Sequence, residues 1–147
     1  MTDMAHGLPG WTHEAQLSVL ARADDMALKA FAEPLIADLP EIEVIENRTG
    51  LVMLPMRDTA QGTHFHLGEV LVSEARIGAG GQEGYGMRRG RDLKAAMAMA
   101  IVDLAVALGH AQGECLSFLE ASSNAQKTTD IETLRRVEAT RVDMETF

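Results

Sequence analysis

The stretch from Gly84 to Gly109, GYGMRRGRDLKAAMAMAIVDLAVALG, predicts a strand, a tight turn and a long helix in succession. Tyr85 to Arg89 is typical of a short strand, and Asp92 is a residue type that favours the N-cap of a helix. Gly109 follows the last apolar turn, where glycine commonly ends a helix. Apolar residues recur along the helix at a spacing that forms one buried face: Leu93, Ala96, Met97, Ala100, Ile101, Leu104 and Leu108. We expect this helix to cover a sheet.

Two further helices are expected at the start of the chain. Thr12 can cap a helix that runs to about Arg22, and Asp24 or Asp25 can cap a second one. The second helix has a regular apolar stripe, made of Leu28, Phe31, Ala32, Leu35, Ile36 and Leu39. Pro34 should kink it, because proline removes a helical hydrogen bond.

The middle of the chain has the alternation of strands. Ile42 to Glu46 and Leu51 to Met56 predict a hairpin, with a turn at Asn47 to Gly50. Thr63 to Ile77 predicts a longer strand whose alternation changes phase at Gly68, which indicates a bulge. The glycines at 78, 80 and 81 predict a turn that leads back into the strand at Tyr85.

The C-terminal part predicts two more helices. One spans about Glu114 to Ala121, a polar joint follows at Ser122 to Lys127, and Thr129 with Glu132 forms a capping box for the last helix. The order of elements favours an α+β fold: an antiparallel sheet of about four strands covered by helices, with N-terminal and C-terminal helical segments. We expect one domain over residues 1–147, with residues 1–10 as a flexible tail.

Composition excludes several classes of protein. The net charge of −9 argues against nucleic acid as a partner, because such proteins carry clustered Lys and Arg. No apolar run approaches the roughly 20 residues needed to cross a membrane. Cys115 is the single cysteine and no signal segment opens the chain, so we expect a cytoplasmic protein.

The turn before the long helix is the strongest candidate for a ligand site. Arg88, Arg89 and Arg91 stand beside Gly90 at a helix N-terminus, where guanidinium groups and backbone N–H groups can hold a phosphate or phosphonate. The alternative is an ordinary strand-to-helix junction in which Asp92 occupies the helix end. No P-loop or dinucleotide-binding pattern is present.

The histidine pair and the single cysteine are the other residues whose chemistry could indicate a site. His64 and His66 would point to the same face of a strand, as metal ligands can, but nothing selects a third ligand. A solvated pair is the alternative, and we predict no metal site. Cys115 has no surrounding pattern of a nucleophile and is expected to pack in the core. No catalytic residue can be assigned.

Several separated segments, in order and over nearly the whole chain, resemble the PhnG family. They are Trp11 with Ser18 to Ala21, Asn47 to Val52, Phe65 to Arg76, Gly84-Tyr85 with Gly90 to Asp92, and Glu138 to Asp143. The sequence departs from the family pattern at Pro34, at His64 and His66, and in the glycine-rich turn at 78–81.

The resemblance implies a subunit of the carbon-phosphorus lyase core complex, with PhnI, PhnH and PhnJ as partners and PhnL acting with them. In that family, methylphosphonate displaces adenine from C1' of ATP and yields α-D-ribose 1-methylphosphonate 5-triphosphate. The catalytic role belongs to PhnI, so we expect an accessory subunit with no cofactor of its own, and with ATP and methylphosphonate as substrates of the complex. The isolated chain is expected to be able to self-associate. The alternatives are a free-standing domain that binds small anions and a histidine-metal enzyme.

Overall fold

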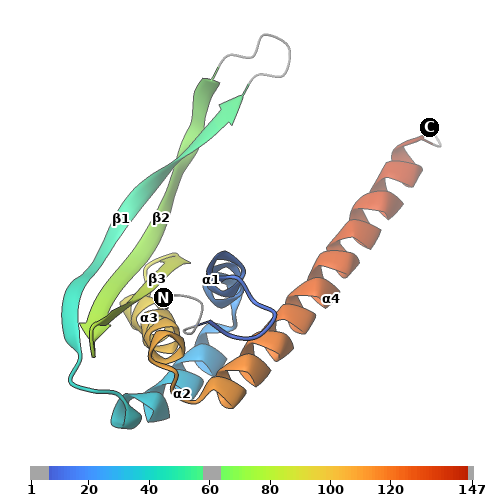
Figure 1. Cartoon of the computed structure of the whole chain (residues 1–147). Helices are drawn as coiled ribbons and strands as arrows, with labels where there is room; N and C mark the ends of the chain where they lie inside the picture. Colours follow the sequence, from blue (N-terminus) through green and yellow to red (C-terminus); the bar gives the residue numbers. More distant parts are fainter. Residues whose placement is uncertain (1–6, 58–63, 146–147) are drawn as a thin grey trace.

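The computed structural model describes residues 7–57 and 64–145, with side chains for all of these except 54–57, 64–67 and 141–145. Within these residues the chain forms four α-helices, one short 3-10 helix and a three-stranded antiparallel sheet of order β1-β2-β3. Helices precede and follow the sheet, which confirms the α+β prediction (Figure 1). No helix among the described residues has the length and apolar character to cross a membrane.

The N-terminal helices begin at the predicted caps. Helix α1 spans His13–Arg22, and the Oγ1 atom of Thr12 accepts a hydrogen bond from the Ala15 N–H at 3.1 Å. Helix α2 spans Asp25–Leu35 and is capped by Asp24, whose carboxylate accepts from the Ala27 N–H at 3.0 Å. Pro34 lies in the last turn of α2, and the chain continues as the 3-10 helix η2 at Ile36–Asp38.

The start of the described chain touches the core at one residue. Leu8 is only 3% exposed and belongs to the hydrophobic core, whereas Gly7, Pro9 and Gly10 are exposed. The flexible tail over residues 1–10 stays a prediction. Residues 1–6 lie outside the described residues.

The sheet has three strands because the predicted first hairpin does not exist. Strand β1 runs without interruption from Glu43 to Arg57, and β2 spans His64–Ala79. Residues 47–50, predicted to turn, instead pair with residues 72–75 of β2. Pairing with a long neighbouring strand satisfies their backbone groups, and this outweighs their local preference for a turn. The bulge prediction is confirmed, since the register of β1 against β2 shifts beside Gly68.

Helix α3, Leu93–Leu108, packs against β3, Gln82–Arg89, at very short distance. A Cβ atom added at Gly84 would collide with the carbonyl oxygen of Ala100, and one at Gly86 would collide with that of Ala96. The two glycines thus let helix and strand approach backbone to backbone. Asp92 caps α3 and Gly109 ends it in the left-handed conformation at φ 76°, both as predicted.

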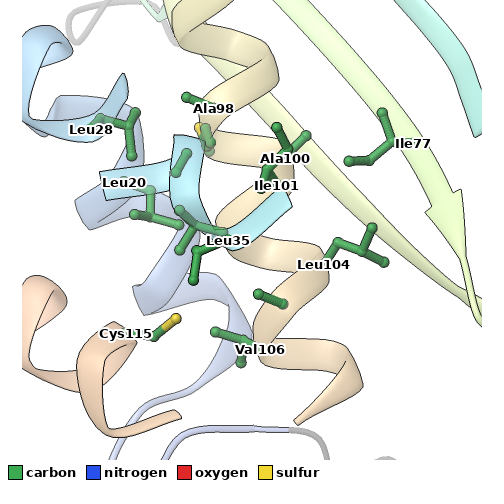
Figure 2. Packing of buried hydrophobic residues seen from close by; sticks show 14 of the residues in the cluster. Leu20, Leu28, Leu35, Ile77, Ala98, Ala100, Ile101, Leu104, Val106 and Cys115 are labelled. Carbon is green, nitrogen blue, oxygen red and sulfur yellow. The ribbon is translucent and has the colours of Figure 1, made fainter. Parts of the chain in front are cut away.

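The core lies between α3, the sheet and the N-terminal helices (Figure 2). Leu20, Leu28, Ile77, Leu104 and Leu119 are fully buried in it, as is Cys115. Many of its members are alanines of α3, which explains how this helix can be buried on almost all sides without losing close contact. The prediction that Cys115 packs in the core is confirmed.

The C-terminal segment is one helix instead of two. Helix α4 spans Gln112–Glu145 without a break at residues 122–127. Thr129, predicted to open a new helix, lies inside α4 and its hydroxyl donates to the Ala125 carbonyl oxygen at 3.1 Å. Residues 122–127 include no glycine or proline, so their polar side chains can continue the helix and hydrogen-bond within it.

Two segments extend beyond the helices and sheet that share the core, here called the body (Figure 1). The β arm is the part of the β1–β2 ribbon past the end of β3, residues 51–57 and 64–71, because β3 pairs only with residues 72–79 of β2. The α4 overhang is residues 131–145, and all of its described side chains, 131–140, are exposed.

Candidate functional site

The turn between β3 and α3 is held by this chain's own polar groups. Gly90 adopts φ +94°, and its N–H donates to the Leu71 carbonyl oxygen at 2.8 Å. The buried hydroxyl of Ser73 donates to the Gly90 carbonyl oxygen at 2.7 Å and accepts from the Asp92 N–H at 2.8 Å. A left-handed glycine and a buried serine thus fix the path of the chain from strand to helix.

The N-terminus of α3 is occupied by Asp92. Its carboxylate accepts from the Ala95 N–H at 3.0 Å and forms an ion pair with Lys29 Nζ at 2.9 Å. The hydrogen bond from Lys29, followed by that from Ala95, lowers the pKa of Asp92 below its ordinary value. An external anion would have to compete with this carboxylate for the helix end.

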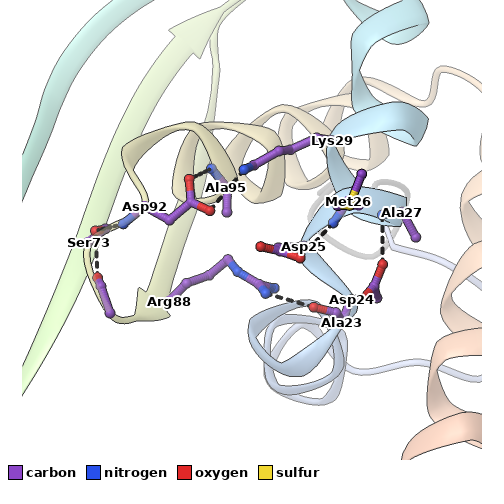
Figure 3. Close-up of polar contacts among 11 residues, drawn as sticks. Ala23, Asp24, Asp25, Met26, Ala27, Lys29, Ser73, Arg88, Asp92 and Ala95 are labelled. Atoms are coloured by element: carbon purple, nitrogen blue, oxygen red, sulfur yellow. Dashed lines mark hydrogen bonds and ion pairs between the residues drawn. The ribbon is translucent and has the colours of Figure 1, made fainter.

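Arg88 joins β3 to the end of α1 (Figure 3). Its Nη1 donates to the Leu20 carbonyl oxygen at 2.6 Å and its Nη2 donates to the Ala23 carbonyl oxygen at 2.7 Å. These carbonyls lie at the C-terminal end of α1, where the helix dipole favours a cation, and the Leu20 carbonyl oxygen also accepts from the Ala23 N–H at 3.3 Å. Burial lowers the pKa of Arg88, but the group remains a cation at neutral pH. Its guanidinium is already engaged within the fold.

Arg89 and Arg91 are both exposed. Within the described part of the chain, neither side chain takes part in a hydrogen bond or an ion pair with another residue. The three arginines singled out in the sequence therefore separate into Arg88, which holds the fold together, and two that remain available. Anion contact by Arg89 and Arg91 stays a prediction.

A buried carboxylate, not singled out by the sequence analysis, lies in the middle of α3. Asp103 is 3% exposed and accepts three hydrogen bonds. Its Oδ1 lies 2.8 Å from His13 Nε2 and accepts from Gln16 Nε2 at 2.8 Å, while its Oδ2 accepts from the Tyr85 N–H at 2.9 Å. Burial raises the pKa of Asp103, and the three hydrogen bonds oppose that shift. A sequence signal for this buried carboxylate does exist, because Asp103 interrupts the apolar run of α3.

A cavity of about 640 Å³ lies beside Asp103. Its walls combine apolar groups, such as Leu8 and Trp11, with the polar side chains of His13, Gln16 and Glu83. Asp103 orients the His13 imidazole, whose side chain is 67% exposed. A histidine–carboxylate pair can transfer a proton. Here the Asp103 carboxylate is fully used by hydrogen bonds from α1 and β3, so the cluster fastens these two elements to α3.

The predicted absence of a metal site is not tested at the two histidines. The side chains of His64 and His66 lie outside the described residues. Among the residues that are described, no group of three or more His, Cys, Asp or Glu side chains could hold a metal ion. Burial raises the pKa of Cys115 to about 11, so this thiol is protonated at neutral pH.

Comparison with known families decides which protein family this fold represents. The family described as "phosphonate metabolism protein PhnG" matches residues 12–147, which begin at the cap of α1. The chain belongs to the PhnG family. Membership places it in phosphonate metabolism, in agreement with the resemblance seen in the separated sequence segments. A search of curated proteins found no match.

This PhnG-family chain exposes apolar side chains in both segments outside the body. In the β arm, the consecutive residues Leu51, Val52 and Met53 are 62%, 40% and 49% exposed. In the α4 overhang, Ile131, Leu134 and Val137 are exposed. Contiguous exposed apolar groups of this kind mark interaction surfaces.

Proposed function

We propose that this chain is an accessory subunit of α-D-ribose 1-methylphosphonate 5-triphosphate synthase in the carbon-phosphorus lyase system. In this role it supports displacement of adenine from ATP by methylphosphonate, while catalysis resides mainly on PhnI. Its partners are PhnI, PhnH and PhnJ, with PhnL acting alongside them in the cytoplasm. The chain brings no cofactor of its own, and ATP and methylphosphonate are the substrates of the complex. Membership of the PhnG family supports this proposal.

The observation that carries the proposal is the β arm. Side chains of consecutive strand residues point to opposite faces, so the exposure of Leu51, Val52 and Met53 shows that the described chain covers neither face there. A two-stranded ribbon is only marginally stable when nothing packs against it. A partner that encloses the arm would bury both faces, and we assign that role to PhnI.

The chemistry of the reaction also favours a catalytic centre on another subunit. Displacement at an anomeric carbon requires stabilisation of positive charge and protonation of the leaving base, usually by placed carboxylates. Asp103 is the carboxylate most shielded from solvent among the described residues, and its hydrogen bonds hold α1 in place. Its position suits the stability of the subunit better than contact with a nucleotide.

The test is co-purification with the cognate PhnI, using Leu51→Asp in the β arm. A buried charge in the interface should weaken the complex at least about tenfold. Met26→Asp is the matched control, because Met26 is an apolar residue of the body that is 76% exposed. The proposal fails if wild type forms no complex with PhnI, or if both variants bind as wild type does.

Adenine release from ATP in the presence of methylphosphonate then tests the predicted anion contacts. Arg91→Ala and Arg89→Ala should leave assembly unchanged, since both side chains are exposed and unengaged in the described chain. A lower rate in an intact complex would support an anion contact at that residue. An unchanged rate in both variants would show that neither arginine contacts a substrate anion. The accessory role would then depend on the co-purification result alone.

A further inference from the structure

We propose that the cavity beside Asp103 binds an uncharged purine base, with adenine as the base that the proposed reaction releases. The inference rests on the proposed function for the identity of the base, and on the groups of the cavity itself for its chemical class. The cavity has a volume of about 640 Å³, which lies in the range of small-molecule sites.

The charge of the cavity excludes the anionic molecules of the reaction. Among the described residues that line it, the ionisable ones are His13, Glu83 and Asp103, and none is a lysine or an arginine. A phosphate or phosphonate group held there would meet two carboxyl groups, with no lysine or arginine to neutralise it. ATP, methylphosphonate and the ribosyl triphosphate product all carry such groups, whereas adenine is uncharged. Adenine is therefore the molecule of the proposed reaction that fits this charge.

The apolar lining of the cavity suits a flat ring. Trp11, the single tryptophan of the chain, lines the cavity and is partly exposed. Leu8 and Val106 line it as well, and they are 3% and 2% exposed. A planar base gains stacking energy on an aromatic ring and removes its faces from water against such groups.

The Gln16 amide is a hydrogen-bonding group of the cavity that is fixed in place. Its Nε2 donates to Asp103 Oδ1 at 2.8 Å, which sets the orientation of the amide. Gln16 is only 2% exposed, yet its Oε1 accepts no hydrogen bond from another described residue and is not an enclosed atom without a partner. The oxygen therefore faces the cavity that Gln16 lines, and it presents an oriented acceptor to a ligand.

His13 supplies a second acceptor. Its Nε2 lies 2.8 Å from the Asp103 carboxylate, so this nitrogen carries the proton in the neutral imidazole. Nδ1 is then an acceptor, and no described residue donates to it. Two acceptors favour a ligand that bears N–H donors. Adenine has such donors on its exocyclic amino group and on its five-membered ring, whereas hypoxanthine has a carbonyl oxygen in place of the amino group.

Titration of the full-length chain with adenine tests the site. Trp11 reports binding through its fluorescence, because it is the single tryptophan, and isothermal titration calorimetry gives the Kd independently. We expect saturable binding of adenine with a Kd at or below about 1 mM, and binding of hypoxanthine and of ATP at least about fivefold weaker. Absence of saturable adenine binding, or equal binding of either of the other two molecules, would overturn the proposal.

Gln16→Ala removes the oriented acceptor. We expect adenine to bind about fivefold more weakly to this variant and to lose its preference over hypoxanthine. Circular dichroism shows whether the variant is folded. A folded variant that keeps both the affinity and the preference would exclude Gln16 and the site built on it.

Glu83→Lys decides the same question without a change in the interior, because Glu83 is exposed. The added cation should strengthen ATP binding about fivefold and should affect adenine much less. Glu120→Lys is the matched control, since Glu120 is an exposed residue of α4 outside the described lining of the cavity. Equal ATP binding by the two variants would overturn the assignment of the cavity.

The outcomes for the cavity and for the proposed function can be told apart. A chain that forms the complex with PhnI but does not bind adenine would overturn the purine site alone. A chain that binds adenine but forms no complex with PhnI would overturn the accessory role and support the purine site.

Discussion

The same strand has different surroundings in the body and in the β arm. Where β2 pairs with β3, helix α3 lies so close that Gly84 and Gly86 leave no room for a Cβ atom. Farther along, β2 pairs only with β1, and Leu51 of β1 is 62% exposed, whereas Ile77 of β2 in the body is fully buried. Both positions hold a large aliphatic residue on a strand. What differs is whether another element of this chain covers the strand, and the uncovered end is the part available to a partner.

Helix α4 repeats this contrast along its own length. Leu119 is fully buried against the body, whereas Leu134, about four turns later, is 63% exposed. The body should thus respond strongly to changes in packing, and the projecting segments should respond mainly through assembly. Four measurements test this distinction.

Gly86→Ala should have the largest effect on the body. The added methyl group would collide with the Ala96 carbonyl oxygen, so α3 must move away from β3. We expect the free energy of unfolding to fall by about 3 kcal/mol or more in chemical denaturation. Gly50→Ala is the control, because a Cβ atom at Gly50 in β1 has no atom within 4 Å. Similar losses in the two variants would contradict the close helix–strand contact.

Asp103→Ala should come next. The change removes the acceptor for Gln16, His13 and the Tyr85 N–H, and leaves buried donors without a partner. A loss of about 2 to 3 kcal/mol in the free energy of unfolding is expected. Glu83→Ala, an exposed change at the rim of the same cavity, should stay within about 0.5 kcal/mol. Equal stability of the two variants would show that the Asp103 cluster does not fasten α1.

Arg88→Ala should have a smaller effect, of about 1.5 kcal/mol. It removes two hydrogen bonds from a charged donor to the carbonyls of Leu20 and Ala23. Arg89→Ala, next in the chain and exposed, should change the free energy of unfolding by less than about 0.5 kcal/mol. Thermal unfolding followed by circular dichroism compares the two. A larger loss in the Arg89 variant would reverse the roles assigned to these arginines.

Tyr85 provides the most local test, on the sheet face turned away from α3. Burial, followed by the hydrogen bond to Glu74 at 2.5 Å, raises the pKa of Tyr85 to about 12. The native phenol keeps its proton to higher pH than the unfolded one, so its contribution to stability is full below about pH 10 and is lost toward about pH 12.

Absorbance at alkaline pH measures this ionisation directly, because Tyr85 is the single tyrosine of the chain. Glu74→Gln should lower the pKa of Tyr85 only in part, since burial is the larger cause. An ordinary value near 10 in the native wild type would contradict the described hydrogen bond.

Sequence patterns predicted the elements whose local signals agree with their surroundings. Thr12, Asp24 and Asp92 cap their helices because each side chain reaches an N–H group three residues later, a purely local geometry. The turn at 47–50 and the joint at 122–127 were wrong for the opposite reason. Local preference there is small, and pairing with β2 or continuation of α4 satisfies more backbone groups.

For the candidate site, the sequence identified the right segment but could not distinguish its arginines. Which of Arg88, Arg89 and Arg91 is engaged depends on where α1 ends in space, and the carbonyls of Leu20 and Ala23 lie more than 60 positions away in the chain. Asp103 was missed because its donors come from α1 and β3, and neither is near it in sequence.

Spacing and residue type within short stretches of the chain were enough to predict the α+β class, the caps, the strand-to-helix junction and the resemblance to the PhnG family. Three-dimensional packing sets the closeness of α3 to β3, the engagement of Arg88, the burial of Asp103 and the exposure of the β arm and α4 overhang. Those properties depend on which distant segments meet, and packing between distant segments has no local pattern in the chain.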